Sequence, residues 1–435
     1  MINIFPILIL LLVVIITTVV LWKKVELKHL NFLANAIIWF LPFEYLPSIP
    51  IMGARLKINY VVITIATYLA VILMIKRKLS FKFNNLTYLF LMFLISTVFS
   101  FENILVLNRF AISYLGLIFC MLAAIIVSNY ATNINLQLKR LFYILCTCAM
   151  FGLYQFVGDI VGLKPKYTFL REMYTKVVFG IPRIQGTSNE PQLFAGILFF
   201  PLAVFVSNYF LKVNNNTFGL KSGVLKYSSM LIVLVFVLTI SKGAFIAFII
   251  GVLVLLVIKY FYNSSSINFV NLSKFGLLVL FLSSLIIVNP SLSKKIEPII
   301  DNIVQTVGGT AATSTERSNF IDLASELLEN NQYRGIGAGQ FGVKTNPKNK
   351  QTYSLIVNNV YLEVWLEYGF LALMLFIIIL ILTFLKVYDL AYKKDVNLAF
   401  VLLVTLLSFL IQWLFFSPIY ITPIFIMIGL CWNEG

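Results

Sequence analysis

Long apolar segments follow one another along almost the whole chain, and they constrain its fold more than any other feature. Hydrophobic residues make up 60% of the 435 residues, and charged residues make up only 11%. A water-soluble core cannot bury that much apolar surface, whereas a helix of about 20 apolar residues crosses the roughly 30 Å hydrocarbon layer of a membrane. The sequence therefore predicts an all-α polytopic membrane protein that forms a single integral domain over residues 1–435.

The apolar segments predict about thirteen transmembrane helices, within a range of eleven to fourteen. The shorter segments are expected to form tilted or broken helices. The first is expected to stay in the protein, because it lacks the basic start and the cleavage site of a signal peptide. The expected spans are 4–22, 30–46, 58–75, 86–101, 105–128, 137–161, 191–210, 227–241, 243–259, 274–289, 357–385, 396–416 and 418–431.

The distribution of Lys and Arg over the connecting loops predicts the orientation of the chain. The net charge is +16, and alternate loops together hold +13 of it, which leaves +3 for the other face. Basic loops stay in the cytoplasm, so the two long loops, 162–190 and 290–356, are expected outside. This orientation accounts for the basic excess, and no nucleic-acid partner is expected. All four cysteines fall within predicted spans, where packing is a better explanation than disulfides.

The larger external loop, 290–356, contains the only segment typical of a water-facing helix, over residues 315–330. Thr313 and Glu316 have capping-box spacing before it. Arg317 lies in the first turn, where a cation opposes the helix dipole unless an anion is bound nearby. An anion site and a solvated arginine beside Glu316 both fit this position. One face of the expected helix is apolar and consists of Phe320, Leu323, Ala324, Leu327 and Leu328.

A glycine-rich segment follows, from Arg334 to Gly342, and it contains the spacing G-x-G-x-x-G. No strand precedes it and no βαβ unit surrounds it, which argues against a dinucleotide site. A tight turn against the membrane face is the better interpretation.

Three more charges occur at positions where a function is plausible. Arg183 and Glu190 end the first external loop, next to a helix that is expected to start around Pro191 with Ser188 or Asn189 as its cap. Lys242 interrupts an apolar stretch, which predicts either a turn or a buried cation. Cations within or at the edge of a membrane are costly and generally functional.

The sequence also limits the chemistry that the external face can supply. The only histidine, His29, falls on the cytoplasmic side, and no cluster of carboxylates is evident for Mg²⁺ or Mn²⁺. We therefore expect no metal and no other cofactor, and a reaction that uses Arg, Lys, Asp, Glu, Tyr and Asn.

The order of these features resembles the O-antigen polymerase (Wzy-type) and O-antigen ligase superfamily. The resemblance covers about the last 250 residues well and the first 180 by hydropathy alone. The segments that carry it are Arg183–Ala195, Ser241–Ala244, Glu316–Arg317, Gly335–Phe341 and Asn358–Gly369.

This resemblance implies an enzyme of the bacterial inner membrane with a GT-C-like architecture and an active site facing the periplasm. Its reaction would be a metal-independent, inverting glycosyl transfer. The donor would be an oligosaccharide on undecaprenyl pyrophosphate, whose reducing-end sugar moves to a sugar hydroxyl. Membrane lipids and a chain-length regulator protein would be its other partners.

The resemblance also suggests roles for particular residues. Lys242 and Arg317 correspond to the two cations that bind pyrophosphate in the family, and Arg183 is a third candidate. Glu190 and Glu363 are the nearest groups that could act as a general base, although either could be structural. Further substrate contacts are assigned to Arg334, Asn358, Asn359 and Tyr361.

One departure bears on the type of transfer. Ligases of this superfamily usually have a histidine before the Asn-x-Tyr-Leu sequence, whereas this chain has Asn358, and an amide cannot accept a proton as a base. This favours a polymerase over a ligase that transfers the glycan to lipid A core. A flippase for lipid-linked oligosaccharides or a solute transporter is the alternative from another class, but the paired repeats typical of transporters are not evident.

Overall fold

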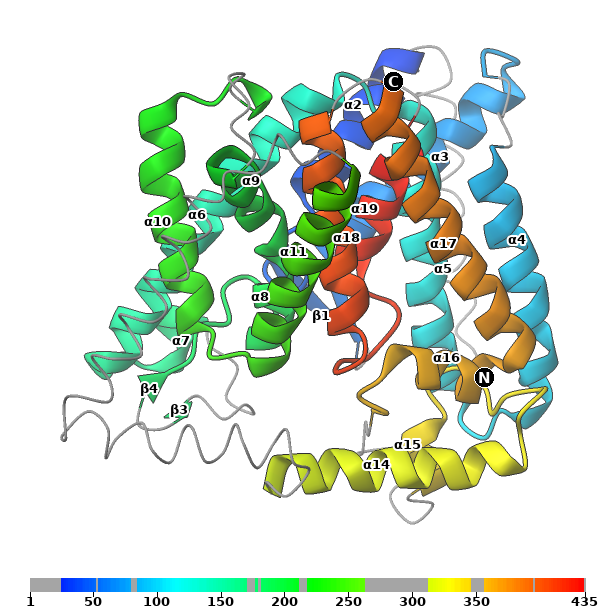
Figure 1. Cartoon of the computed structure of the whole chain (residues 1–435). Helices are drawn as coiled ribbons and strands as arrows, with labels where there is room; N and C mark the ends of the chain where they lie inside the picture. The colour runs from blue at the N-terminus through cyan, green and yellow to red at the C-terminus, as the bar shows by residue number, and fades with distance from the viewer. Residues whose placement is uncertain are drawn as a thin grey trace.

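The computed structural model describes residues 25–51, 54–79, 84–169, 177–178, 181–210, 217–262, 312–345, 356–393 and 396–433. Over these residues the protein is a bundle of helices, with one further helix lying across one end of the bundle (Figure 1). The spans expected at 4–22 and 274–289 lie outside the described residues.

The described amino-terminal part contains five α-helices, a 3₁₀ helix and a short hairpin that the apolar pattern did not predict. The hairpin pairs Ser48 with Lys57 in antiparallel register. Each strand has only four residues, so apolar segments compared at the length of a membrane span could not indicate it. The elements are α2 (Leu27–Trp39), β1 (Ser48–Ile51), β2 (Ala54–Lys57), α3 (Ile58–Ile75), α4 (Asn85–Thr97), a 3₁₀ helix η1 (Val98–Asn103), α5 (Leu107–Tyr130) and α6 (Ile134–Ile160).

In the middle of the chain, the span expected at 191–210 is broken into two helices that meet at an angle of 41°. Pro201 lies in the first turn of the second helix, where a missing backbone N–H removes no intrahelical bond. The elements are α7 (Pro165–Thr168), β3 (Val177–Val178), β4 (Ile181–Pro182), α8 (Pro191–Ile197), α9 (Phe199–Phe210), a 3₁₀ turn η2 (Thr217–Gly219), α10 (Ser222–Leu238) and α11 (Lys242–Tyr262).

In the carboxyl-terminal part, the span expected at 357–385 is also broken, at Gly369. This glycine has φ of 92°, and an added Cβ would clash with the carbonyl of Tyr333. Only glycine fits such a position. The elements are α14 (Ala312–Glu329), α15 (Phe341–Thr345), α16 (Val360–Tyr368), α17 (Phe370–Lys393), α18 (Val396–Gln412) and α19 (Thr422–Cys431).

The core of the bundle is built around α18 and α19. Helix α18 packs against α9, α11 and α17, and α19 packs against α5. All ten residues of α19 are buried, although the helix is too short to cross a membrane at about 1.5 Å per residue. Long-range packing between the two halves of the chain thus holds the bundle together.

The all-α polytopic class is confirmed, but the count of thirteen spans is not. Among the described residues, five helices are long and apolar enough to cross a membrane, or six if α8 and α9 form one bent span. Four further apolar helices have only 10–17 residues. Hydropathy could not show where a continuous apolar segment changes direction.

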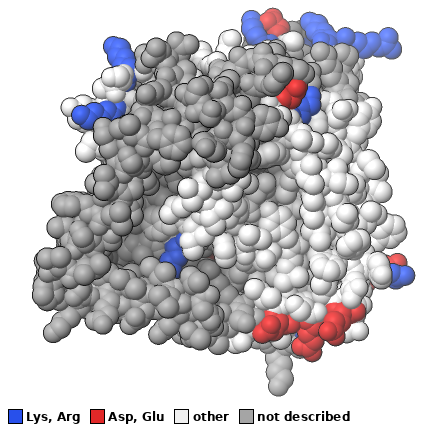
Figure 2. All heavy atoms as spheres, in the orientation of Figure 1, with Lys and Arg blue, Asp and Glu red and all other residues white. Residues whose placement is uncertain are grey.

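The two ends of the bundle differ in charge. Lys139 donates to the carbonyl of Gly219 at 2.9 Å, and Arg140 lies over the ring of Trp39. Lys139 and Arg140 in the first turns of α6 and the loop that contains Gly219 belong to the more basic group. Figure 2 shows most of the visible Lys and Arg at the top of the view, with some Asp and Glu among them, and a patch of Asp and Glu at the opposite end. The acidic patch lies on α14 and includes the exposed residues Asp322, Glu326 and Glu329.

Helix α14 occupies nearly the residues expected for the external helix. Ala324 and Leu328 are buried as predicted, but Leu323 is 38% exposed. The predicted capping box is wrong, because the helix begins at Ala312 and Thr313 therefore lies within it.

Candidate functional site

Arg183 lies against the break between α10 and α11. Its Nε donates to the carbonyl of Thr239 at 3.1 Å, and its Nη2 donates to the carbonyl of Ile240 at 3.5 Å. The backbone N–H of Ile184 donates to the carbonyl of Leu238. Carbonyls in the last turn of a helix lack intrahelical partners, and a cation there complements the helix dipole. Arg183 therefore caps α10 and is held at the break.

Lys242 is the first residue of α11. The sequence left open whether a turn or a buried cation interrupts the apolar stretch, and the structure shows a turn with Lys242 half-buried beside it. Ile240 in this turn has φ of 47°, an uncommon conformation for a β-branched residue. Arg183 bonds to Thr239 and Ile240, so the structure brings this predicted cation to the turn directly before Lys242. Two nearby cations raise the local potential and favour a bound anion.

The segment that carries Arg183 is packed inside the protein, although it was expected to be the end of an external loop. Gln185 and Ser188 are each 2% exposed. Gly186 exchanges two hydrogen bonds with the side-chain amide of Gln155 on α6, at 2.8 and 3.1 Å. Buried polar groups need such partners. Residues 183–190 are thus a fixed part of the bundle.

Glu190 occupies the N-cap position of α8, half-buried, without a side-chain bond to the helix. The cap expected at Ser188 or Asn189 is therefore wrong. Pro191 takes the first helical position, which its fixed φ suits, so the residue directly before it becomes the N-cap.

Gln192, which no local sequence pattern indicated, joins three elements at this site. Its Nε2 donates to the carbonyl of Phe415 at 3.1 Å, and its own carbonyl accepts from Nε2 of Gln412 at 2.7 Å. Its side chain also lies beside Gly243 on α11. The only available signal was its position within Arg183–Ala195.

The start of α16 lies against the end of α18. Asn359 is the N-cap, and its side chain accepts from the N–H of Leu362 at 3.0 Å. The Tyr361 hydroxyl donates to the carbonyl of Leu410 at 3.0 Å. Asn358 has φ of 59°, which asparagine tolerates better than most residues. In this structure all three predicted substrate contacts have such local roles.

Glu363 and Glu367 lie one turn apart on α16, and each is 4% exposed. Glu363 Oε1 accepts from the N–H of Ile419 at 3.4 Å, and Glu367 Oε2 accepts from the N–H of Gly339 at 2.8 Å. Glu363 Oε2 is buried and has no hydrogen-bond partner among the described residues. The i, i+4 spacing of Glu363 and Glu367 could have indicated that the two carboxyls are neighbours.

Burial controls the protonation of this carboxyl pair, which lies outside the candidate membrane spans. It raises the pKa of Glu363 to about 7. The pKa of Glu367 is also raised, first by burial and then by the charge of Glu363. A group that titrates near neutral pH is well suited to accept a proton. Glu363 therefore has a pKa in the range that suits a general base.

The glycine-rich segment forms the predicted turn and packs on α16. The N–H groups of Ile336 and Gly337 donate to the carbonyls of Leu366 and Glu367 at 2.8 and 2.9 Å. Arg334, before the turn, forms an exposed ion pair with Glu102 at 2.6 Å. The structure thus places Arg334 at a different contact from Arg183 and Lys242. Arg317 lies on α14, but its side chain is outside the described part.

Residues 412–419, between α18 and α19, connect the two parts of the site. Gln412 and Phe415 bond to Gln192, whereas the carbonyl of Trp413 accepts from Val360 on α16 and Ile419 bonds to Glu363. A basic part with Arg183 and Lys242 and an acidic part with Glu363 therefore share one connecting segment.

Residues 227–377 match the O-antigen ligase family. The matched region contains Lys242, Arg317 and Glu363 and ends within α17, but it does not include Arg183. It supports the resemblance to the O-antigen ligase and polymerase superfamily. No protein in a search of curated sequences matched the chain.

Proposed function

We propose that this chain, which carries an O-antigen ligase domain at residues 227–377, polymerises oligosaccharide repeat units linked to undecaprenyl pyrophosphate on the periplasmic face of the bacterial inner membrane. In the reaction, a sugar hydroxyl of one lipid-linked unit attacks the anomeric carbon of another. The bond from that carbon to the pyrophosphate oxygen breaks, a glycosidic bond of inverted configuration forms, and the hydroxyl proton passes to a base.

This proposal rests on the hydrogen bonds from the Arg183 guanidinium to the carbonyls of Thr239 and Ile240, just before Lys242. Pyrophosphate is unfavourable near hydrocarbon unless cations neutralise it, and a guanidinium presents a fork of donors that fits phosphate oxygens. The bonds to the α10 carbonyls hold Arg183 in one place before substrate arrives. Fixed cations of this kind stabilise a leaving group as its charge develops. Arg317 on α14 is the third cation of the proposal.

Glu363 is the base that we favour over Glu190. Its pKa of about 7 allows it to accept a proton at neutral pH. It is bonded to Ile419, in the same segment that contacts Gln192 and Gly243 beside Lys242.

A ligase that transfers the glycan to lipid A core is the second candidate, because the matched family bears that name. The side chain of Asn359 is engaged as the N-cap of α16, and neither Asn358 nor Asn359 can serve as a base. These residues favour the polymerase.

Reconstituted protein supplied with a synthetic undecaprenyl-pyrophosphate repeat unit tests the proposal. A ladder of lengthened glycans, formed without any energy source, is the expected result. Transfer to added lipid A core without a ladder would identify a ligase. Movement of the lipid across vesicles without any glycosidic bond formation would identify a flippase.

A further inference from the structure

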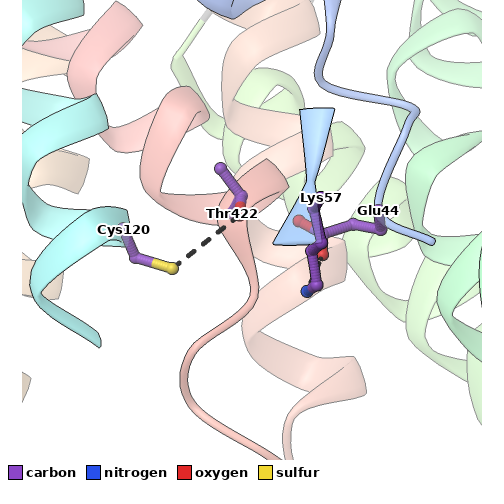
Figure 3. Close-up of polar contacts among 4 residues, drawn as sticks. All are labelled: Glu44, Lys57, Cys120 and Thr422. Atoms are coloured by element: carbon purple, nitrogen blue, oxygen red, sulfur yellow. Dashed lines mark hydrogen bonds and ion pairs between the residues drawn. The ribbon is translucent and has the colours of Figure 1, made fainter. Parts of the chain in front are cut away.

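A buried ion pair joins Lys57 and Glu44 near the centre of the bundle (Figure 3). Lys57 Nζ lies 2.6 Å from Glu44 Oε2, and the side chains are 22% and 2% exposed. Glu44 follows α2, whereas Lys57 ends β2 directly before α3, so the β1–β2 hairpin brings the two together. No local sequence pattern indicates either residue.

This pair is surrounded by other elements of the core. Lys57 Nζ lies 5.2 Å from the centre of the Tyr60 ring on α3. The same region holds Cys120 of α5 and Thr422 of α19, whose side chains contact each other at 3.9 Å (Figure 3). A buried ion pair is often no more stabilising than apolar residues of the same size. The main effect of this pair is therefore to fix the relative positions of the two segments that it joins.

The segment fixed by Glu44 is bonded to the segment that carries Arg183. The N–H groups of Tyr45 and Leu46 both donate to the carbonyl of Thr187, at 3.1 and 3.0 Å. The Thr187 hydroxyl donates back to the carbonyl of Pro42 at 2.5 Å. Three hydrogen bonds thus connect Pro42, Tyr45 and Leu46, which lie on both sides of Glu44, to Thr187, four positions after Arg183.

We infer that Lys57 and Glu44 are positioning residues for the anion site. The ion pair fixes the position of residues 42–46, and their hydrogen bonds fix the position of Thr187. Thr187 belongs to the same segment as Arg183, so the guanidinium of Arg183 is kept at the break before Lys242. The effect on substrate rests on the proposed function, whereas the effect on the 183–190 backbone does not.

Hydrogen exchange of the full-length protein in nanodiscs tests the positioning without any substrate. The double variant Glu44→Leu with Lys57→Met removes both charges and leaves an apolar pair, which avoids an unpaired buried charge. We expect amides in 183–190 to exchange about tenfold faster or more, while α5 and α19 keep their protection. Lys57→Arg should keep the wild-type protection.

Thr383→Val is the matched control, because Thr383 accepts a buried hydrogen bond from Trp432 at 2.8 Å, away from this site. It should leave exchange in 183–190 unchanged. Unchanged exchange in the Glu44 and Lys57 double variant would overturn the inference. So would equal loosening of the whole bundle, since that would show a general loss of stability.

Binding of undecaprenyl pyrophosphate gives the functional readout. The double variant should raise the Kd about tenfold, and adding the same changes to Arg183→Ala should raise it little further, because the pair acts through Arg183. Additive effects would contradict positioning through Arg183. If the wild type binds no such lipid, the proposed function fails, and the exchange experiment still decides the inference.

Discussion

The Nε of Arg183 donates to the carbonyl of Thr239 at 3.1 Å, across 56 residues of sequence. This bond gives Arg183 a structural role, since it caps α10, and it also places the guanidinium beside the first turn of α11. The same residue can therefore support the fold and present a charge to substrate. Its substitution must be judged by ligand binding together with stability.

Substitution of Lys242 distinguishes a role in binding pyrophosphate from a lysine that only extends its charge to the membrane surface. If Lys242 binds pyrophosphate, Lys242→Met should abolish turnover and Lys242→Arg should preserve it. Charge-assisted hydrogen bonds are worth about 1.5 to 3 kcal/mol each, so the loss of two lowers rate or binding roughly a hundredfold or more. Turnover of the reconstituted variants measures this. A Met variant that is fully active would remove Lys242 from the site.

Arg317→Ala should abolish polymer formation while protein level and membrane insertion stay normal, because the proposed partner of Arg317 is substrate phosphate. Arg317→Lys should rescue poorly, since a point charge lacks the bidentate fork. Glycan ladders from cells that express each variant measure the effect. A complete ladder from the Ala variant would show that Arg317 is not needed to bind substrate phosphate.

Glu363 should give the reaction a dependence on pH. A base must be ionised to accept a proton, and burial raises the pKa of Glu363 to about 7. We expect kcat/KM to rise with pH up to about 7 and then to level off. Glu363→Gln should remove this rise and lower the rate about 10²- to 10⁴-fold. A variant with the wild-type profile would exclude Glu363 as the base.

The raised pKa of Glu363 also means that the stability of the folded protein falls as pH rises, whereas activity increases. The folded protein holds the Glu363 proton more tightly than the unfolded chain, in which the pKa is near 4.5. The resulting stabilisation is complete below the unfolded pKa and is lost as pH rises through the folded value. Glu363→Gln should therefore raise the melting temperature more at pH 8 than at pH 5. An equal change at both values would argue against this shift.

Activity should survive EDTA. Glu363 and Glu367 provide only two carboxylates, and each already accepts a backbone hydrogen bond. The cations of the proposed site would neutralise pyrophosphate without a divalent ion. Polymer yield with and without EDTA measures this. Loss of activity that Mg²⁺ or Mn²⁺ specifically restores would show that the metal-free mechanism is wrong.

The sequence predicted those parts of the fold that depend on local pattern. Helices α3, α5 and α6 lie close to their expected spans, and the glycine-rich segment at Gly335–Gly339 is the expected turn, because apolar length and glycine conformation act locally. The breaks at Leu198 and Gly369 were missed, since hydropathy continues through them while the direction of the chain changes.

The site was predicted only in part for a related reason. Lys242 could be identified because a charge is conspicuous within an apolar stretch, and Arg183 because it ends an external loop in a segment that carries the family resemblance. No local pattern indicates contacts between residues that are distant in sequence. Such contacts include the bonds from Arg183 to the turn before Lys242, the Gln192 contacts and the Glu44–Lys57 pair. Glu367 is the exception, because its spacing from Glu363 was visible.

The most direct test of the central claim is the Kd of undecaprenyl pyrophosphate for reconstituted wild type, Arg183→Ala, Lys242→Met and the control Arg140→Ala. Arg140 lies over Trp39 at the other end of the bundle. We predict that each site variant raises the Kd about tenfold or more, at roughly 1.4 kcal/mol per factor of ten, and that the control leaves it unchanged. Values for both site variants within twofold of the wild type would contradict the account.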